Sequence, residues 1–362
     1  MDTYQLEEYL SNGVESIVAA IMKATLKNPK ESFFMMQYMR DSKKARRIRK
    51  KQEEQGNHIP PFLIASITKQ CNLHCKGCYA RANHSCTNSI SCDNKWLTTK
   101  EWGAIFEEAT SLGIGFILLA GGEPFLRQDV LQEASKYRKI LFPVFTNGTM
   151  MTKEVLELLD QNRNLIPILS IEGNEEITDG RRGKGTYRTL MKSMQDLKQK
   201  GILFATSVTV TTQNMRETVS EDFVQKISSE GGKGIIYVEY VPVDAATKNL
   251  ALEDTARNEM LKTLNILRIK RNDMLLIAFP GDEKSSGGCL AAGRGFFHIN
   301  AHGGAEPCPF SPYSDVNVKD IGLAEALKSP LFLKLKENGN LENEHIGGCV
   351  LFEQEEKVKK ML

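Results

Sequence analysis

The stretch Pro61 to Tyr79, PFLIASITKQCNLHCKGCY, decides how the rest of the chain is interpreted. An apolar, strand-like run is followed at once by three cysteines in a C-x3-C-x2-C spacing, namely Cys71, Cys75 and Cys78. Because soft thiolate ligands suit iron–sulfur clusters, one tight loop with this spacing can hold three irons of a [4Fe–4S] cube. The fourth iron then has no protein ligand and is open to a substrate or cofactor. The alternatives are a zinc knuckle or three unrelated thiols.

Length and charge narrow the class of protein. The 362 residues are enough for two domains and a sizeable core. Lys and Arg number 47 against 45 Asp and Glu, so nothing global points to nucleic acid as a partner. No apolar run reaches the roughly eighteen residues of a membrane span, and the acidic start does not resemble a secretory signal. We therefore expect a cytoplasmic protein, in which eight cysteines favour metal binding or catalysis over disulfides.

Residues 1 to about 58 are expected to be helical. Apolar residues recur at helical spacing around Val14 to Met22, and Asn28-Pro29 marks a break before a second helix. The second helix carries a basic run between Lys43 and Lys51. This run could touch an acidic membrane surface, a partner or a substrate. The interpretation we prefer is a helical pair packed on the main domain with a solvated basic face.

From about residue 60 to 280 the pattern changes to short apolar runs that alternate with helical stretches. The strand-like runs are 62–67, 115–120, 140–145, 166–171, 202–210 and 234–241. The helix-like segments lie near 99–112, 127–138, 152–160, 186–200 and 215–230. Such repeats predict right-handed βαβ crossovers and a parallel sheet. In such folds the chemistry sits at the carboxyl ends of the strands.

The loops that carry candidate site residues each follow a predicted strand. Gly121-Gly122-Glu123-Pro124 follows the second strand, and its glycines let the backbone approach a ligand closely because no Cβ intervenes. Thr146-Asn147-Gly148 ends the third strand. Ser170-Ile171-Glu172 ends the fourth and places a hydroxyl and a carboxylate there.

The cysteine loop, the Gly-Gly-Glu-Pro turn and the Thr-Asn-Gly loop together resemble the radical S-adenosylmethionine (SAM) superfamily. The resemblance implies an α/β fold, a partial (β/α)6 barrel. It also implies that the open iron is chelated by the amino and carboxylate groups of SAM. One electron from the cluster then cleaves SAM to methionine and a 5′-deoxyadenosyl radical. A flavodoxin or ferredoxin would donate that electron.

The resemblance also assigns residues to the SAM site. The residues implied to bind SAM are Tyr79, Gly121, Gly122, Glu123, Pro124, Thr146, Asn147, Ser170, Glu172, Arg182 and Ser207. Glu172 stands where the family more often has Asp, which keeps the charge and lengthens the reach. An arginine of Asp179-Gly180-Arg181-Arg182-Gly183 would face the SAM carboxylate, unless this stretch is a surface turn. Tyr240, after the sixth strand, is a substrate contact or a core residue.

A composition shift near residue 280 introduces a glycine-rich segment with further cysteines. Cys289 and Cys308 fit C-x13-G-x4-C and flank a hairpin-like run, and Cys349 follows. This resembles, in part, the SPASM/Twitch extension, which implies a small α+β unit and an auxiliary iron–sulfur cluster, expected to be [4Fe–4S]. The fourth iron would bind substrate or take Asp282, Glu283 or His298 as ligand. The alternative is three structural cysteines without metal.

Cys86 and Cys92 lie in the loop after the first cysteine motif. They suit a hydrogen-atom donor, a fourth cluster ligand or, more simply, a spare pair of thiols.

The sequence thus predicts a helical segment (1–58), a radical SAM core (59–280) and an auxiliary-cluster unit (281–362). The expected activity is hydrogen-atom abstraction from a peptide or a small-molecule substrate, with the auxiliary cluster assisting oxidation or substrate binding. A non-catalytic iron–sulfur carrier or redox sensor is the competing hypothesis.

Overall fold

The core of the molecule is one twisted sheet. The computed structural model describes residues 3–25, 28–87, 96–243, 245–282, 287–341 and 349–362. Among these residues the sheet has nine strands in the order β7-β6-β5-β4-β3-β2-β1-β8-β9. The strands are β1 (Phe62–Thr68), β2 (Phe116–Gly121), β3 (Phe142–Thr146), β4 (Leu165–Ser170), β5 (Ala205–Val210), β6 (Gly234–Glu239), β7 (Leu275–Phe279), β8 (His298–Ile299) and β9 (Ala305–Glu306). Neighbouring strands from β7 to β1 are parallel, as is the β1–β8 pair, and β8–β9 is an antiparallel hairpin.

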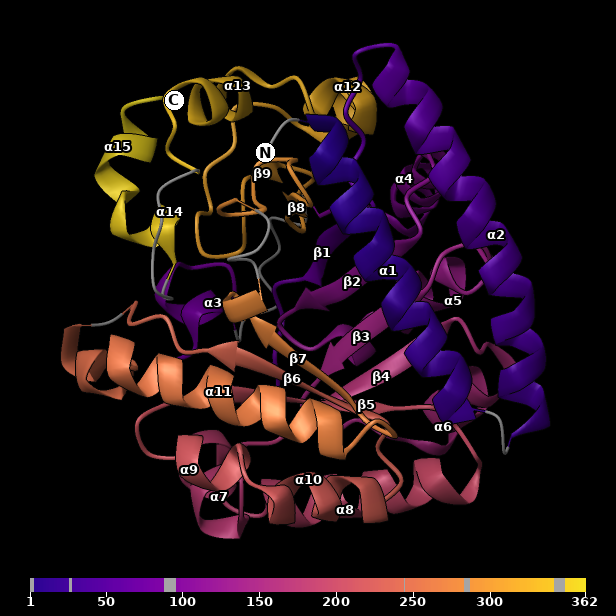
Figure 1. Ribbon diagram of the computed structural model, residues 1–362, viewed down its shortest axis with the longest axis vertical. Coiled ribbons are helices and arrows are strands. Elements are labelled where there is room, and N and C mark those ends of the chain that lie inside the picture. The colour runs from indigo at the N-terminus through magenta and orange to yellow at the C-terminus, as the bar shows by residue number, and fades with distance from the viewer. Residues whose placement is uncertain (1–2, 26–27, 88–95, 244, 283–286, 342–348) are drawn as a thin grey trace.

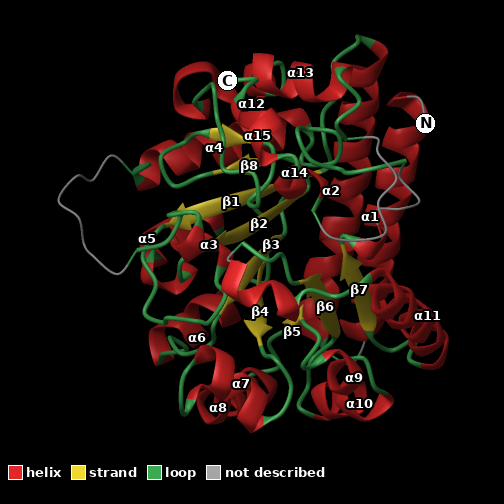
Figure 2. Cartoon of the chain, turned by 90° about the vertical axis from the view of Figure 1, so that its left-hand side faces the viewer, coloured by secondary structure: helices red, strands yellow, loops and turns green. Residues whose placement is uncertain are grey.

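Helices surround the convex face of this sheet (Figures 1 and 2). Those connecting the strands are α3 (Tyr79–Ala82), α4 (Thr99–Leu112), α5 (Gln128–Ala134), α6 (Lys153–Gln161), α7 (Glu175–Arg182), α8 (Thr186–Gln199), α9 (Met215–Thr218), α10 (Glu221–Ser229) and α11 (Asp254–Lys270). Local sequence explains their ends: α4 begins with a capping box between Thr98 and Glu101 and ends at Gly113, whose φ is 80°.

The predicted fold class, a partial radical SAM-type barrel, is confirmed. Each of the six predicted strands forms within a few residues of its expected place. Strand β7 and the helix before it, α11, were not expected. The apolar run Leu275–Phe279 is only five residues long and is buried on alternate positions, so it was not separated from the composition shift beside it. Arg181 and Arg182 lie in the last turn of a helix, α7, and not in a surface turn.

The two N-terminal helices, α1 (Thr3–Thr25) and α2 (Pro29–Glu54), pack against the amino ends of the strands. In Figure 1 they lie at the end of the sheet opposite α3. Met35 and Tyr38 of α2 are fully buried against Phe116 and Leu141, and Tyr38 donates a hydrogen bond to the Gly115 carbonyl at 2.7 Å. This agrees with the preferred interpretation of a helical pair packed on the main domain.

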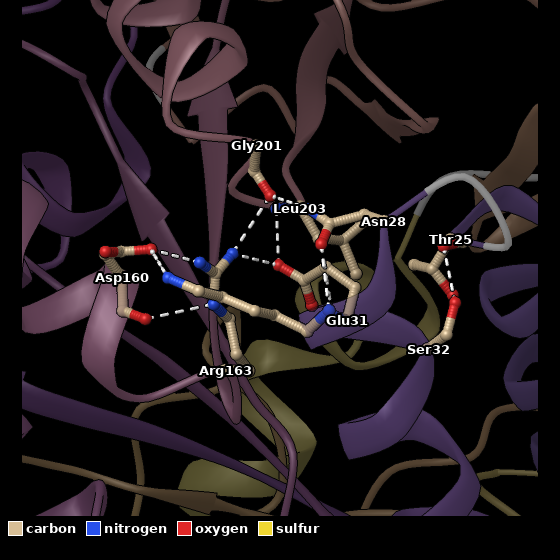
Figure 3. A network of polar contacts seen from close by, with 9 residues as sticks. Thr25, Asn28, Glu31, Ser32, Asp160, Arg163, Gly201 and Leu203 are labelled. Atoms are coloured by element: carbon tan, nitrogen blue, oxygen red, sulfur yellow. Dashed lines mark hydrogen bonds and ion pairs between the residues drawn. The ribbon is translucent and has the colours of Figure 1, made fainter.

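A buried ion pair ties α2 to the barrel (Figure 3). The Glu31 carboxylate is 2% exposed and accepts hydrogen bonds from Arg163 Nη1 at 2.5 Å and from the Leu203 backbone N at 3.0 Å. Because Arg163 precedes β4 and Leu203 precedes β5, one side chain of α2 holds the starts of two neighbouring strands.

The C-terminal segment continues the sheet beyond β1. His298 of β8 is buried, with Nε2 2.7 Å from Ser66 Oγ of β1 and Nδ1 2.7 Å from Glu306 Oε2 of β9. Helices α12 (Val318–Ala326), α13 (Pro330–Glu337), α14 (Val350–Glu353) and α15 (Glu355–Lys359) complete the segment. The division into three domains stays a prediction. No helix in the described ranges is both long and apolar enough to cross a membrane.

Candidate active site

The three-cysteine loop lies where β1 ends and runs into α3. The Cys71, Cys75 and Cys78 side chains are partly exposed. Gly77 has φ +64°, and a Cβ there would lie 2.6 Å from the Tyr240 hydroxyl, so the turn needs glycine. Tyr240 therefore packs against the loop. In the described part of the chain no three Cys, His, Asp or Glu side chains form a site for a single metal ion.

The Gly121-Gly122 turn is pressed against this loop. The Gly122 N donates to the Thr68 carbonyl at 2.8 Å, and the Glu123 N donates to the Gln70 carbonyl at 2.7 Å. A Cβ on Gly122 would lie 1.9 Å from the Gln70 oxygen. These glycines therefore allow a close approach of the turn to the cysteine loop itself, a role that was not predicted. Their contact with SAM stays a prediction.

Glu123 is fully buried and organises the third strand end. Its carboxylate accepts hydrogen bonds from Thr146 Oγ1 at 2.7 Å, the Asn147 N at 2.8 Å and the Phe125 N at 3.1 Å. Burial raises the pKa of the Glu123 carboxyl to about 7, although these hydrogen bonds oppose the shift. Glu123 therefore acts on the site through the backbone that it holds.

Two further contacts join the strand ends. Asn147 Nδ2 donates to Asn72 Oδ1 at 2.8 Å, which links the Thr-Asn-Gly loop to the cysteine loop. Ser170 and Ser207 lie opposite each other on β4 and β5, with their hydroxyl oxygens 3.2 Å apart. The structure thus brings together predicted site residues from four strands.

Glu172 binds arginines. Its carboxylate is fully buried, with Oε1 2.6 Å from Arg181 Nη1 and 2.8 Å from Arg182 Nε. Oε2 accepts from the Thr209 N at 3.1 Å. This carboxylate is therefore shared by two guanidinium groups and a backbone amide, and its predicted contact with the SAM ribose stays untested.

Helix α7 in turn touches the cysteine loop. The Lys76 N donates to the Arg181 carbonyl at 2.9 Å, and Arg182 Nη1 lies 4.0 Å from Cys75 Sγ. Burial raises the pKa of the Cys75 thiol above its ordinary value, and the Arg182 guanidinium opposes that shift. A cluster bound by three thiolates carries negative charge, so the donor set and the arginine beside it fit the [4Fe–4S] group.

Cys86 is buried beside Cys71, a neighbour that the sequence did not reveal. A hydrogen bond from the Cys86 thiol is the largest influence on Cys71 and helps lower its pKa to about 6. The same contact and burial raise the pKa of Cys86. Cys92 lies outside the described residues.

Comparison with known proteins identifies this arrangement. Residues 65–222, which run from β1 to the start of α10, match the model of the Radical SAM superfamily. This part of the chain is a radical SAM domain. Members bind SAM and a [4Fe–4S] cluster.

The chain is also similar to individual known proteins. The chain is 30% identical over 160 residues to Fe-coproporphyrin III synthase of Methanosarcina barkeri, which covers 43% of this chain and 39% of that protein. It is 25% identical over 288 residues to the sporulation killing factor maturation protein SkfB of Bacillus subtilis, which covers 77% of this chain and 68% of that protein. Streptococcus suis SuiB, bound to its precursor peptide SuiA, superposes with a TM-score of 0.64 and 17% identity over 84% of this chain and 72% of SuiB. At that identity, the superposition shows the shared fold.

Beyond the radical SAM core, the three later cysteines meet at a second site. Cys289, Cys308 and Cys349 line one cavity, and the Cys308 and Cys349 thiols are in hydrogen-bond contact. This contact raises the pKa of Cys308, and burial adds to the shift. Three cysteines spread over about sixty residues of sequence, from Cys289 to Cys349, thus supply one set of soft ligands, as an auxiliary iron–sulfur cluster requires.

Two of the side chains proposed as the fourth ligand of that cluster are engaged elsewhere. Asp282 forms a bidentate pair with Arg268 Nη2, at 2.7 and 3.0 Å, and accepts from the Ala278 N at 2.8 Å. His298 is held between Ser66 and Glu306. Glu283 lies outside the described residues.

An aromatic contact connects the first cysteine site with the second. The Tyr79 ring, next to Cys78, lies 4.7 Å from the Phe310 ring, which lines the cavity of the later cysteines. Tyr79 therefore faces the auxiliary site, and its predicted contact with SAM stays untested. This pairing was not predicted, because no local sequence pattern relates residues so far apart.

Proposed function

We propose that this chain is an enzyme that reductively cleaves SAM and abstracts a hydrogen atom from a substrate. One observation carries the proposal: the cysteine loop, the Gly-Gly-Glu-Pro turn, the Thr-Asn-Gly loop and α7 are joined into one network at the carboxyl ends of the strands. When bound, the [4Fe–4S] cluster supplies the electron that cleaves SAM to methionine and a 5′-deoxyadenosyl radical.

The residues of the network have separable roles in this proposal. Cys71, Cys75 and Cys78 hold three irons. The turn at Gly121–Pro124 and the loop at Thr146–Asn147 shape the pocket for the methionine part of SAM, and Ser170 with Ser207 offers hydroxyl groups beside it. Arg182 places a positive charge near Cys75, while Glu172 orients Arg182.

Cys289, Cys308 and Cys349 hold the auxiliary cluster in this proposal. Bound to these cysteines, the cluster would supply an electron acceptor or a binding site for the substrate. The contact between Tyr79 and Phe310 places the auxiliary site beside the cysteine loop, which supports a shared substrate space.

We favour a peptide as the substrate, because SkfB is a maturation protein and aligns with 77% of this chain. A second candidate is a small molecule of the tetrapyrrole class, supported by the relative named Fe-coproporphyrin III synthase, of which the chain spans 39%. A short precursor peptide encoded next to this chain would favour the first candidate. A flavodoxin or ferredoxin as electron donor and a cytoplasmic location belong to the same proposal.

The test is anaerobic reconstitution with iron and sulfide, followed by incubation with SAM and dithionite. The proposal predicts 5′-deoxyadenosine from the wild-type protein and none from Cys75→Ala. A variant of an exposed residue on the opposite side, Lys44→Ala, serves as the control and keeps the activity. Full cluster loading without SAM binding would instead support an iron–sulfur carrier or redox sensor.

A further inference from the structure

We infer that Glu239 is the fourth protein ligand of the auxiliary cluster, next to Cys289, Cys308 and Cys349. The inference rests on the proposed function, because it takes the auxiliary cluster from there. It differs from the sequence-based candidates, which all lay in the segment after residue 280.

The cavity of the later cysteines contains one charged side chain. Its other lining residues are apolar: Val241, Phe279, Pro280, Phe296, Phe310 and Val350. Glu239 is 4% exposed. Arg257 already compensates its charge, so it is the position of this carboxylate that points to a ligand. The carboxylate lies in the same cavity as the three thiols and would offer an oxygen ligand to an iron held by them.

The fold explains why this carboxylate reaches the site. Glu239 is the last residue of β6 and lies beside Val210 of β5, so it stands at the edge of the sheet that carries the chemistry. Its Oε1 accepts a hydrogen bond from Arg257 Nε of α11. This contact with Arg257 fixes the direction of the carboxylate, as partners of metal-binding carboxylates commonly do.

The chemistry is also consistent. Iron accepts carboxylate as well as thiolate ligands. In clusters where a non-thiolate ligand replaces a thiolate, the reduction potential and the magnetic properties change. With Glu239 bound, every iron has a protein ligand, so the auxiliary cluster would transfer electrons and not bind the substrate.

The experiment isolates the auxiliary cluster in the full chain. Cys71, Cys75 and Cys78 are replaced by Ala, the protein is reconstituted with iron and sulfide, and the reduced cluster is examined by electron paramagnetic resonance with and without excess 2-mercaptoethanol. In this parent, the spectrum should be unchanged by the thiol, because no iron is open. With Glu239→Gln added, 2-mercaptoethanol should shift the spectrum, since it occupies the vacated position. Glu239→Cys should give the shifted spectrum without added thiol, which also covers the case in which Glu239→Gln folds poorly.

Asp282→Asn in the same parent is the matched control and should leave the spectrum as it was. A parent spectrum that already responds to 2-mercaptoethanol would overturn the inference, as would a Glu239→Gln spectrum identical to that of the parent. A parent that folds but holds no iron would remove the auxiliary cluster from the proposed function and the inference with it. The two failures are therefore distinguishable.

Discussion

Glu172 is the residue on which the arginines of the site depend. Its carboxylate is fully buried between Arg181 and Arg182. Replacing it by Gln leaves two partly buried guanidinium groups without their counter-charge, so Glu172→Gln should lower the free energy of unfolding by about 3 kcal/mol. Urea unfolding measures this loss.

Glu175→Gln is the matched control, since the Glu175–Arg188 pair is exposed. It should change the free energy of unfolding by less than about 0.5 kcal/mol. A Glu172→Gln variant as stable as this control would show that the ion pairs do not hold α7 in place.

Glu123 should make stability depend on pH. Burial raises its pKa from 4.5 to about 7, so the native state keeps this proton at pH values where the unfolded chain has lost it. The stabilisation is fully present below about pH 4.5 and is lost as the pH rises through 7, a change of roughly 3 kcal/mol. Relative to Glu123→Gln, the wild-type protein should therefore lose stability between about pH 4.5 and 7. Parallel pH profiles of the two proteins would contradict this assignment.

The sequence predicted which residues gather at the site, but it made no prediction of the contacts that these residues form with one another. Glu172 and Glu123 were expected at the site, and both are there, but each faces other protein groups. A motif gives the position of a side chain along the chain. Its direction depends on neighbours such as α7, which come from tertiary packing.

The close contact between the end of β2 and the cysteine loop leaves no room for a side chain at Gly122. Gly122→Ala would place a Cβ 1.9 Å from the Gln70 oxygen, so two backbone segments would have to separate. We expect destabilisation by about 3 kcal/mol and loss of most cluster-bound iron after reconstitution. Gly180→Ala in α7, where a Cβ meets nothing within 4 Å, should keep its iron and be neutral or slightly stabilised. Equal amounts of bound iron in the two variants would show that this contact is not needed for cluster binding.

The attachment of α2 can be tested at Glu31. Glu31→Gln removes the buried counter-charge of Arg163 and weakens the hold on the starts of β4 and β5. The thermal midpoint should fall, with a loss of about 3 kcal/mol. Lys30→Ala, which breaks the exposed pair with Asp160, should cause almost no change. A folded Glu31→Gln variant with an unchanged midpoint would mean that the N-terminal pair adds nothing to the stability of the barrel.

Elements with long, regular patterns were predictable and short ones were not. The helix at Thr99–Leu112 carries its own capping box and was placed to the residue. Strand β7 has five residues, and β8 and β9 have two each, so their pairing depends on the sheet that they join. Segments of two to five residues are too short to show a hydrophobic periodicity.

For the whole molecule, the arrangement of two cysteine sites around one sheet edge is the main feature. The first site was predictable because its ligands lie within eight residues of one another. The second draws on Cys289, Cys308, Cys349 and, as we infer, Glu239, which only the folded chain brings together. Residue spacing in the sequence therefore could not indicate Glu239 as a ligand.

The central claim is that Cys71, Cys75 and Cys78 hold a cluster whose open iron binds SAM. The most direct measurement uses a variant with Cys289, Cys308 and Cys349 replaced by Ala, so that one cluster of about four irons remains. The electron paramagnetic resonance spectrum of the reduced protein is recorded with and without SAM, and no substrate is needed. We predict that SAM changes the spectrum, because its amino and carboxylate groups become ligands of the open iron. A fully loaded cluster whose spectrum does not respond to saturating SAM would contradict the account.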